Sequence, residues 1–350
     1  MGAGHPAQAH CRRGVRAVLE GLPPGSLALA AVSGGTDSLA LAGALAAEGA
    51  PHDVTVGAII VDHGLQPDSA ETALLAAQQC GDLLLAPVAI VQAVVAASGD
   101  GLEAAAREAR YSALAETAAA MGEEHPAHVV LLGHTRDDQA EQVLLGLARG
   151  SGARSLAGMP ALVVREGTPF VRPLLHLPRD TTEQACAAWG LVPWEDPMNS
   201  DRAYARVRVR QALAMLEDDL GPGLGEALAR SADLLRDDAD LLDDLAEAAV
   251  PDDDPAGVPV GVLADLAPAL RSRVWRRLLL RAGSPAGAVT AAHVAACDGL
   301  VTDWHGQGPL HVPGNLRVGR ADGRVRITPR PRFTVFATIP KDGQGKEGAS

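Results

Sequence analysis

Lysine and aromatic residues are scarce in this sequence. Aromatic residues make up 3% of the chain, and lysine supplies only two of the 30 basic side chains. Both lysines, Lys341 and Lys346, lie in the last ten residues. The folded body of the protein therefore has no lysine that could act as a nucleophile, which excludes enzymes that depend on one.

Cysteine is also rare, and long apolar runs are absent. The four cysteines form no CxxC pair and have no metal-ligand spacing: Cys11, Cys80, Cys186 and Cys297. We expect free thiols in a reducing compartment. No uncharged apolar run of about 18 residues occurs, so no membrane span is predicted. Residues 1–14 lack the apolar core of an export signal. The sequence thus predicts a cytoplasmic protein without a membrane partner.

Acidic charge is concentrated in one segment. The formal net charge is −13, and residues 217–254 alone hold 14 acidic and 2 basic side chains. The remainder is nearly neutral and contains three arginine clusters, at residues 202–210, 271–281 and 317–332. Such clusters can bind nucleic acid, although they can equally be solvated faces of helices and strands.

The first 150 residues alternate apolar strands with helical patterns. The predicted strands cover residues 27–32, 54–62, 88–91 and 128–134, and the predicted helices cover 38–49, 69–81, 103–121 and 137–149. Continuous apolar strands that alternate with helices predict an α/β fold with a parallel sheet covered on both faces. Ligands bind such sheets at the carboxyl ends of the strands, where the polar turns of this sequence lie.

The rest of the chain predicts a smaller second domain. A helix over about 180–189 precedes a polar loop, and helical patterns then cover about 204–247. A linker or turn is predicted at 251–259, followed by a small helical unit and short strands up to about 330. We expect a catalytic domain at 1–215, a mainly helical C-terminal domain at 216–332, and a disordered tail at 333–350.

The turn at residues 33–38, SGGTDS, has the character of a phosphate-binding loop. Gly34 and Gly35 allow a tight turn and a close approach to a ligand, while the following helix offers free N–H groups. Ser33 and Ser38 add hydroxyl groups. Asp37 makes sense beside phosphates only if a cation such as Mg²⁺ lies between them. This is not a Walker A loop, because it lacks the required lysine. The alternative is an ordinary helix N-terminus.

This loop resembles that of the PP-loop ATP pyrophosphatases. The resemblance implies a Rossmann-like domain of the adenine nucleotide alpha-hydrolase type, which cleaves ATP between the α and β phosphates. Members of this superfamily adenylate a carbonyl or carboxyl oxygen, and a nitrogen or sulfur nucleophile then displaces AMP. ATP and Mg²⁺ are the implied cofactors.

Further motifs indicate one member of the superfamily. They are VDHGL (61–65), GLEAAAREARY (101–111), GHTRDDQAE (133–141), RGSG (149–152), RPLL (172–175) and EDPMNSD (195–201), which leads to Arg206 and Arg210. In this order and spacing they resemble the tRNA(Ile)-lysidine synthetase family over roughly residues 25–215. Gln142 and Val207 depart from the family pattern, which often has Thr and Asn at these positions. The C-terminal part resembles the family only loosely.

The resemblance implies a tRNA-modifying ligase. The C2 oxygen of the wobble cytidine, in the minor isoleucine tRNA with a CAU anticodon, attacks the α-phosphate of ATP. The amine of free L-lysine then displaces AMP to give lysidine, which pairs with A instead of G. Decoding changes from AUG to AUA. The resemblance is also compatible with a homodimer.

Roles for individual residues follow from the resemblance and from residue chemistry. The catalytic candidates are Asp37, Asp138 and Arg110, and the Mg²⁺ ligands are Asp37 and Asp138. The ATP-binding candidates are Ser33, Gly34, Gly35, Thr36, Asp37, Ser38, His63 and His134. The lysine-binding candidates are Asp137 and Glu141, and the tRNA-binding candidates are Arg206 and Arg210, which share a helical face at i, i+4.

Structural alternatives remain for several of these residues. Asp137 can cap a helix, and Arg110 can form a surface pair with Glu103. His63 and His134 can be structural histidines. For Trp189 and Trp194 we favour core packing over stacking on a base. The residues alone do not assign each carboxylate to Mg²⁺ or to lysine.

Two other functions compete with the tRNA ligase. One is amidation of a small molecule by a related PP-loop enzyme, but no N-terminal cysteine glutaminase signature is present. The other is a non-catalytic nucleotide-binding or RNA-binding module, against which the intact Asp37 and Asp138 argue. The cysteine spacing argues against sulfur transfer. For the acidic segment 217–254 we expect a position away from the path of the tRNA.

Overall fold

A computed structural model describes residues 4–62, 64, 68–93, 102–150, 152–194, 203, 205–250 and 257–330, with the side chains of 102–104 left out. The chain divides into two compact units, Met1–Asp237 and Asp238–Ser350. The predicted tail at 333–350 and most of the predicted linker at 251–259 lie outside the described residues. Among the described helices, none is both long and apolar enough to cross a membrane.

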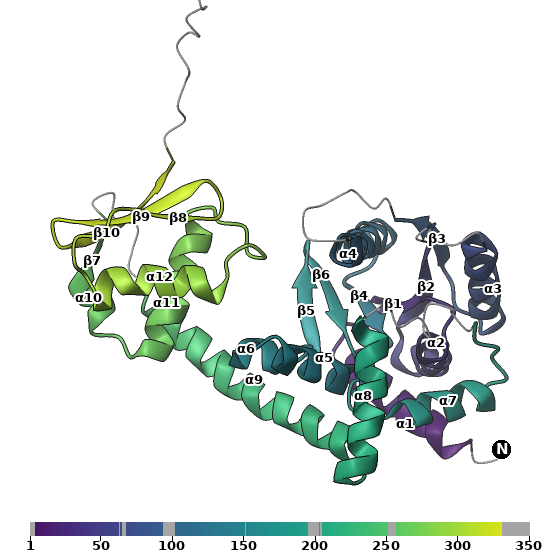
Figure 1. The fold of residues 1–350 in the computed structure, drawn as a ribbon. Coiled ribbons are helices and arrows are strands. Elements are labelled where there is room, and N and C mark those ends of the chain that lie inside the picture. The colour runs from purple at the N-terminus through teal and green to yellow at the C-terminus, as the bar shows by residue number, and fades with distance from the viewer. Residues whose placement is uncertain are drawn as a thin grey trace, which may run out of the picture. The chain divides into compact units, whose positions relative to one another are not determined.

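The first unit contains a six-stranded sheet and most of the helices (Figure 1). Its strands are β1 (Leu27–Val32), β2 (Thr55–Asp62), β3 (Val88–Gln92), β4 (His128–Leu132), β5 (Leu162–Arg165) and β6 (Thr168–Val171). Its helices are α1 (Pro6–Leu19), α2 (Thr36–Gly49), α3 (Ser69–Asp82), α4 (Leu102–Gly122), α5 (Arg136–Ala148), α6 (Ala153–Leu156), α7 (Arg179–Ala188) and α8 (Ala205–Leu220). α9 (Leu224–Ala248) runs across the boundary into the second unit.

The sheet has the order β3-β2-β1-β4-β6-β5. All neighbouring strands are parallel except β5, which pairs antiparallel with β6. Leu27 at the start of β1 lies opposite both Thr55 of β2 and His128 of β4. The predicted α/β fold with a parallel sheet is therefore confirmed.

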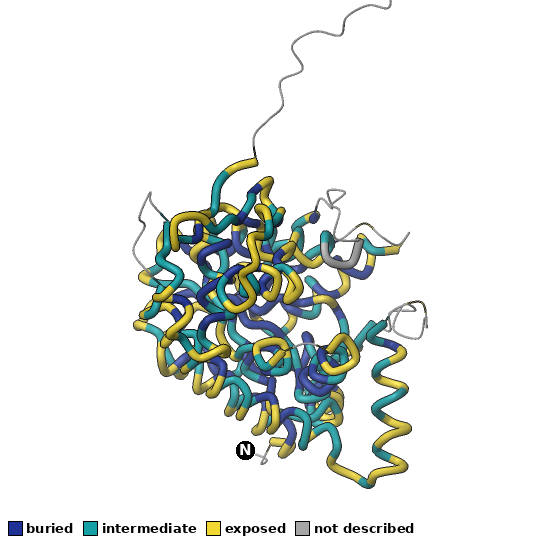
Figure 2. The backbone as a smooth tube through the Cα atoms, turned by 60° about the vertical axis from the view of Figure 1, so that its left-hand side comes forward, coloured by how far each residue is buried: buried dark blue, intermediate teal, exposed yellow. Residues whose placement is uncertain are grey.

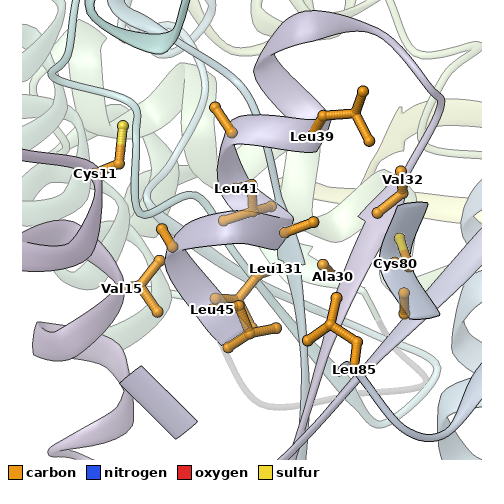
Figure 3. Close-up of a cluster of buried hydrophobic side chains, with 14 of the residues drawn as sticks. Cys11, Val15, Ala30, Val32, Leu39, Leu41, Leu45, Cys80, Leu85 and Leu131 are labelled. Carbon is orange, nitrogen blue, oxygen red and sulfur yellow. The ribbon is translucent and has the colours of Figure 1, made fainter. Parts of the chain in front are cut away.

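Alternate residues of β1 face two separate cores. Ala28, Ala30 and Val32 join one cluster, which includes residues of α1, α2 and α3. Figure 3 shows this cluster, with leucines of α2 beside Ala30 and Val32 of β1. Leu27 and Leu29 face the opposite way and pack with residues of α4. Because both faces are covered, every residue of β1 is buried, and Figure 2 shows buried backbone gathered in the interior.

The strand order creates a switch point between β1 and β4. From β1 the chain crosses through α2 to β2 on one side, whereas β4, reached through α4, lies on the other side of β1. A crevice forms at the carboxyl ends of the strands where the connections diverge in this way. The turns that follow β1 and β4, residues 33–38 and 133–135, both lie at this point.

The second unit combines helices with an antiparallel sheet. Its helices are α10 (Val260–Ala264), α11 (Pro268–Arg281) and α12 (Ala291–Thr302), and its sheet has the order β7-β10-β9-β8. The strands are β7 (Val258–Pro259), β8 (Leu310–Val312), β9 (Leu316–Ala321) and β10 (Arg324–Pro329). Trp275 of α11 is fully buried in its core, with Val318 and Val325 of the sheet. The predicted helical unit followed by short strands is confirmed.

Within this unit, the acidic helix α9 pairs with the basic helix α11. Asp243 accepts a hydrogen bond from Arg273 at 2.9 Å, and Glu247 accepts one from Arg281 at 2.7 Å. Glu247 also pairs with Arg277. Part of the negative charge in segment 217–254 is thus neutralised by an arginine cluster of the same chain.

Candidate active site

The loop after β1 is held in a tight turn. Gly34 has a φ of +83°, a conformation that favours glycine. The Ser38 hydroxyl accepts a hydrogen bond from the Ser33 N–H at 3.1 Å and donates one to the Gly35 carbonyl at 2.8 Å. The N-cap residue of α2 is Gly35, which has no side chain. The N–H groups in the first turn of α2 therefore donate no hydrogen bond to a capping side chain. This geometry suits an anion.

The turn after β4 lies directly against this loop. A Cβ atom added at Gly133 would come within 2.9 Å of the Asp37 carbonyl oxygen, so a side chain here would push the two segments apart. Thr135 then caps α5, because Asp138 Oδ2 accepts hydrogen bonds from the Thr135 N–H at 2.8 Å and from its hydroxyl at 3.0 Å. Glycine at 133 therefore brings Asp37 and Asp138 into one site.

The first turn of α7 joins these two segments. The Arg179 side chain donates to Asp138 Oδ1 at 2.8 Å and to Asp37 Oδ2 at 3.4 Å. The Arg179 N–H donates to Asp137 Oδ2 at 2.8 Å. Thr182, one turn further on, donates its hydroxyl proton to Asp37 Oδ1. Neither Arg179 nor Thr182 is among the predicted site residues.

Glu141 completes this group of carboxylates and is only 3% exposed. Glu141 Oε1 accepts a hydrogen bond from Arg210 Nε of α8 at 2.8 Å, and it lies 3.5 Å from Arg179 Nη1. Arg210, which is predicted to bind tRNA, therefore contacts Glu141, which is predicted to bind the substrate lysine. Asp37, Asp137, Asp138 and Glu141 are called the acidic cluster below.

Burial and charge shift the pKa values in the acidic cluster. Burial raises the pKa of Asp37 above its ordinary value, and repulsion from Asp138 adds to the rise, while Thr182 and Arg179 oppose it. Burial alone lowers the pKa of Arg179, but Asp138, Asp37 and the other carboxylates outweigh burial and raise it. The cluster therefore favours a bound cation.

The acidic cluster suits a Mg²⁺ ion that arrives with ATP. No trio of His, Cys, Asp or Glu side chains in the described part of the chain is arranged to hold a metal on its own. Asp37 and Asp138 nevertheless point one oxygen each at a single cation, the Arg179 guanidinium. Two carboxylates together with substrate phosphates are the usual ligand set for Mg²⁺ in nucleotide sites.

A second wall of the site is basic. Arg172, which follows β6 and is 4% exposed, donates to the Tyr111 hydroxyl at 2.9 Å and to His134 Nδ1 at 3.3 Å. Burial lowers the pKa of His134 well below 6.5, with Arg172 as the next cause. His134 is therefore neutral at physiological pH and carries its proton on Nε2, because Nδ1 accepts from Arg172.

The arginines of this wall repel one another. Burial lowers the pKa of Arg110, as does the positive charge of three neighbouring arginines. Arg107, Arg110, Arg172 and Arg206 are called the basic cluster. An anion bound among them would relieve the repulsion, so the basic cluster suits phosphate groups.

The structure brings most of the predicted site residues together. The loop residues 33–38 and the acidic cluster meet at the switch point, and His134 contacts the basic cluster, which contains Arg110 and Arg206. Asp137 accepts a hydrogen bond from the N–H of Arg179 at the start of α7, whereas α5, the helix that contains Asp137, is capped by Thr135 with Asp138. Trp189 packs on the core beside α2, as expected. His63, Glu195–Asp201 and the Glu103 side chain lie outside the described residues.

Two family models match the sequence. Residues 8–217 match the PP-loop domain, and residues 259–326 match the TilS substrate binding domain. A solved structure of the U34-tRNA thiolase NcsA from Methanococcus maripaludis, with its 4Fe–4S cluster, aligns with a TM-score of 0.55 and 20% identity. The alignment covers 66% of this chain and 80% of the thiolase, and it shows a shared fold.

Curated relatives match nearly the whole chain. The tRNA(Ile)-lysidine synthase of Thermobifida fusca is 51% identical over 326 residues, which cover 92% of this chain and 98% of the relative. The tRNA(Ile)-lysidine synthase of Streptomyces coelicolor is 49% identical, over 88% of this chain and 86% of the relative. That of Salinispora arenicola is 47% identical, over 93% and 98%. The chain therefore belongs to the tRNA(Ile)-lysidine synthase family.

Proposed function

We propose that this protein joins the side-chain amine of free lysine to C2 of the wobble cytidine in the isoleucine tRNA with a CAU anticodon. Membership of the family makes the protein a ligase that forms a carbon–nitrogen bond on tRNA, and its PP-loop domain makes ATP the energy source. Three further details belong to the proposal: an adenylated cytidine is the intermediate, free lysine is the donor, and decoding changes from AUG to AUA.

One observation carries the proposal: two clusters of opposite charge meet at the turn after β4, which lies against the phosphate loop. The acidic cluster suits the two cationic ligands of the reaction, Mg²⁺ and the lysine ammonium group. The basic cluster suits the two anionic ligands, the ATP phosphates and the tRNA backbone. A single-substrate nucleotide-binding module has no need of both clusters.

In the first step, the cytidine C2 oxygen attacks the α-phosphate of ATP, and pyrophosphate leaves. The N–H groups at the start of α2 and the hydroxyls of Ser33 and Ser38 bind the phosphates, while Arg110 offsets the negative charge that develops. Mg²⁺, when bound by Asp37 and Asp138, would neutralise phosphate charge. Neutral His134 supplies an Nε2–H donor without adding positive charge.

In the second step, the lysine amine attacks C2, and AMP leaves. Asp137 and Glu141 are assigned to the ammonium group of lysine, since they lie beside the Mg²⁺ candidates. The amine must lose a proton before or during attack, and a carboxylate of the acidic cluster can accept it. Arg206 and Arg210 bind the tRNA in this proposal. Arg210 also donates a hydrogen bond to Glu141.

Lysine incorporation tests the proposal. Purified protein is incubated with ATP, Mg²⁺, radiolabelled lysine and a CAU-anticodon isoleucine tRNA transcript, with elongator methionine tRNA in parallel. We expect label on the isoleucine tRNA alone. The label should be lost in Asp37→Asn and retained in Asp82→Asn, which removes an exposed carboxylate at the end of α3.

Two other outcomes would overturn the proposal. Release of pyrophosphate without label on either tRNA would indicate amidation of another substrate. Binding of ATP without either product would indicate a non-catalytic module.

A further inference from the structure

Among the described residues, Arg179 is the one cation that contacts three members of the acidic cluster through its side chain. Its guanidinium lies 2.8 Å from Asp138 Oδ1, 3.4 Å from Asp37 Oδ2 and 3.5 Å from Glu141 Oε1. Its side chain is only 20% exposed. These carboxylates come from the phosphate loop and from α5, whereas Arg179 comes from α7.

Each of the two Mg²⁺ candidates has one oxygen fixed by the fold and one oxygen on Arg179. In Asp37, Oδ1 accepts from Thr182 and Oδ2 faces Arg179. In Asp138, Oδ2 accepts from Thr135 and Oδ1 faces Arg179. The two oxygens that converge on a common point are therefore those that the guanidinium holds.

Formal charge makes the same point. The four carboxylates of the acidic cluster meet two guanidinium groups, those of Arg179 and Arg210. The described cluster is thus two negative charges in excess, and it would be three in excess without Arg179. A cation that takes the two converging oxygens must displace a guanidinium, and a displaced guanidinium needs an anion nearby.

We propose that Arg179 is a positioning residue that occupies the cation site until nucleotide arrives. Arg179 gives up Asp37 and Asp138 to the divalent cation and pairs instead with phosphate oxygens bound at the neighbouring loop. Metal binding therefore depends on nucleotide phosphate, and the metal alone binds weakly. This inference rests on the proposed use of ATP and Mg²⁺ and adds to it a residue that couples the two.

Mn²⁺ binding to the protein without nucleotide tests this role directly, with free Mn²⁺ followed by electron paramagnetic resonance. We expect Arg179→Gln to bind Mn²⁺ about tenfold more tightly than the wild type, because one opposing charge is removed at short range. The double variant with Asp138→Asn should lose the gain, which places the ion at the acidic cluster. Arg136→Gln is the matched control, since its partner is Glu226 on α9.

The sign of the change separates the role proposed here from a merely structural one. If Arg179 only aligns the carboxylates, Arg179→Gln will bind Mn²⁺ as weakly as the wild type or more weakly, and the proposal is overturned. Arg179→Lys keeps the charge and serves if the glutamine variant does not fold. Its affinity should stay within about threefold of the wild type, and a tenfold gain would also overturn the proposal.

The titration contains neither tRNA nor lysine, so its failure is distinct from that of the proposed function. Tight Mn²⁺ binding by Arg179→Gln with no lysine incorporation by the wild type would sustain the role of Arg179 and reject the ligase chemistry. Lysine incorporation without the Mn²⁺ gain would do the reverse.

Discussion

Asp37, a predicted catalytic residue, has a charge that the folded protein stabilises poorly. Burial and the neighbouring Asp138 raise the pKa of Asp37, so its charged form costs free energy in the folded state even with Thr182 and Arg179 as partners. A carboxylate kept under such conditions fits a role in binding a cation. The closeness of Asp37 to Asp138 makes the charge of Asp37 costly, and the same closeness lets the two carboxylates bind one cation.

We predict opposite effects of Asp37→Asn on activity and on stability. Lysine incorporation should fall at least about a hundredfold, which is typical for loss of one electrostatic contact to a transition state. The melting temperature at pH 7 should rise, because asparagine keeps an acceptor for Thr182 without the buried charge. Differential scanning fluorimetry against pH provides the measurement.

The pH dependence of that gain has a defined sign. The folded pKa of Asp37 lies above the unfolded value, so the cost of ionisation is present above the folded pKa and disappears below about 3.8. The difference between the variant and the wild type should therefore shrink as the pH falls. A melting temperature that is lower in Asp37→Asn at pH 7 would contradict this account.

His134 makes a second pH-dependent contribution. Burial, Arg172 and Arg110 lower the pKa of His134 well below 6.5. Below about pH 6.5, His134 therefore binds a proton in the unfolded chain but stays neutral in the folded chain. The wild type should lose stability as the pH falls below about 6.5, by at most about 1.4 kcal/mol per pH unit from this group. His134→Gln should lack that part of the loss.

Urea unfolding at pH 5.5, 6.5 and 7.5 measures this difference. His10→Gln, which removes an exposed imidazole of α1, reports the general effect of losing a histidine side chain. Equal acid sensitivity of the wild type and His134→Gln would show that His134 does not stay neutral in the folded protein.

At the scale of elements, the site depends on how closely β4 approaches the phosphate loop. A Cβ atom at Gly133 would lie 2.9 Å from the Asp37 carbonyl oxygen and 3.1 Å from the Ser38 Cα atom. Backbone atoms cannot rotate away as a side chain can. The loop after β1 and the cap of α5 must therefore move apart if residue 133 carries a side chain.

We predict that Gly133→Ala disrupts activity more than it disrupts folding. Overpacking of this kind costs about 1–3 kcal/mol in stability, while a shift of the loop relative to Asp138 should lower kcat/KM about a hundredfold. Gly81→Ala is the control, because a Cβ atom at Gly81 of α3 meets nothing within 4 Å. Wild-type kinetics in Gly133→Ala would show that the two segments have room to adjust.

Strong periodicity explains which elements the sequence predicts. β1 covers the predicted residues 27–32, and α3 covers Ser69–Asp82 against a predicted 69–81. β5 and β6 are not predicted, since each has four residues and the two are joined by a tight turn at Glu166 and Gly167. Four residues is the shortest length at which a strand pattern can be recognised, and here Arg165 and Pro169 also interrupt the apolar residues.

The N-terminal helix α1 is a different case, because the signal is present. Ala7, Cys11, Val15 and Leu19 are buried and recur every four residues, and the helix begins with a capping box formed by His5 and Gln8. The many polar and basic residues between them conceal the pattern. Buried cysteine and alanine carry less apolar weight than leucine, although they pack equally well.

Motifs locate the candidate site, but they do not supply its contacts. Asp37 and Asp138 are predicted because they lie in recognisable sequence motifs. Arg179 lies in no such motif, at the start of a helix 41 residues after Asp138. Only the packing of α7 against the two turns reveals that Arg179 and Thr182 touch the carboxylates. The boundary predicted between residues 215 and 216, and the roles of single residues, stay predictions.

At the scale of the whole molecule, net charge is a poor guide to RNA binding. The chain carries −13 overall, yet it belongs to a family that acts on tRNA. Within the second unit, Asp243 and Glu247 are engaged with arginines of α11. Phosphate binding depends on local positive potential, and paired carboxylates contribute little to the field at a distance.

We predict that the exposed carboxylates of α9 do not control tRNA affinity. Asp237→Asn, Asp238→Asn and Asp244→Asn together should change the tRNA Kd by less than about twofold at physiological salt, because exposed charges are screened beyond about 8 Å. Asp243→Asn should instead lower thermal stability, since it leaves Arg273 without its partner on α9. Filter binding at two salt concentrations measures the tRNA Kd of the triple variant, and differential scanning fluorimetry measures the melting temperature of Asp243→Asn. A large gain in affinity for the triple variant, strongest at low salt, would mean that the acidic helix opposes the tRNA and that segment 217–254 lies along its path.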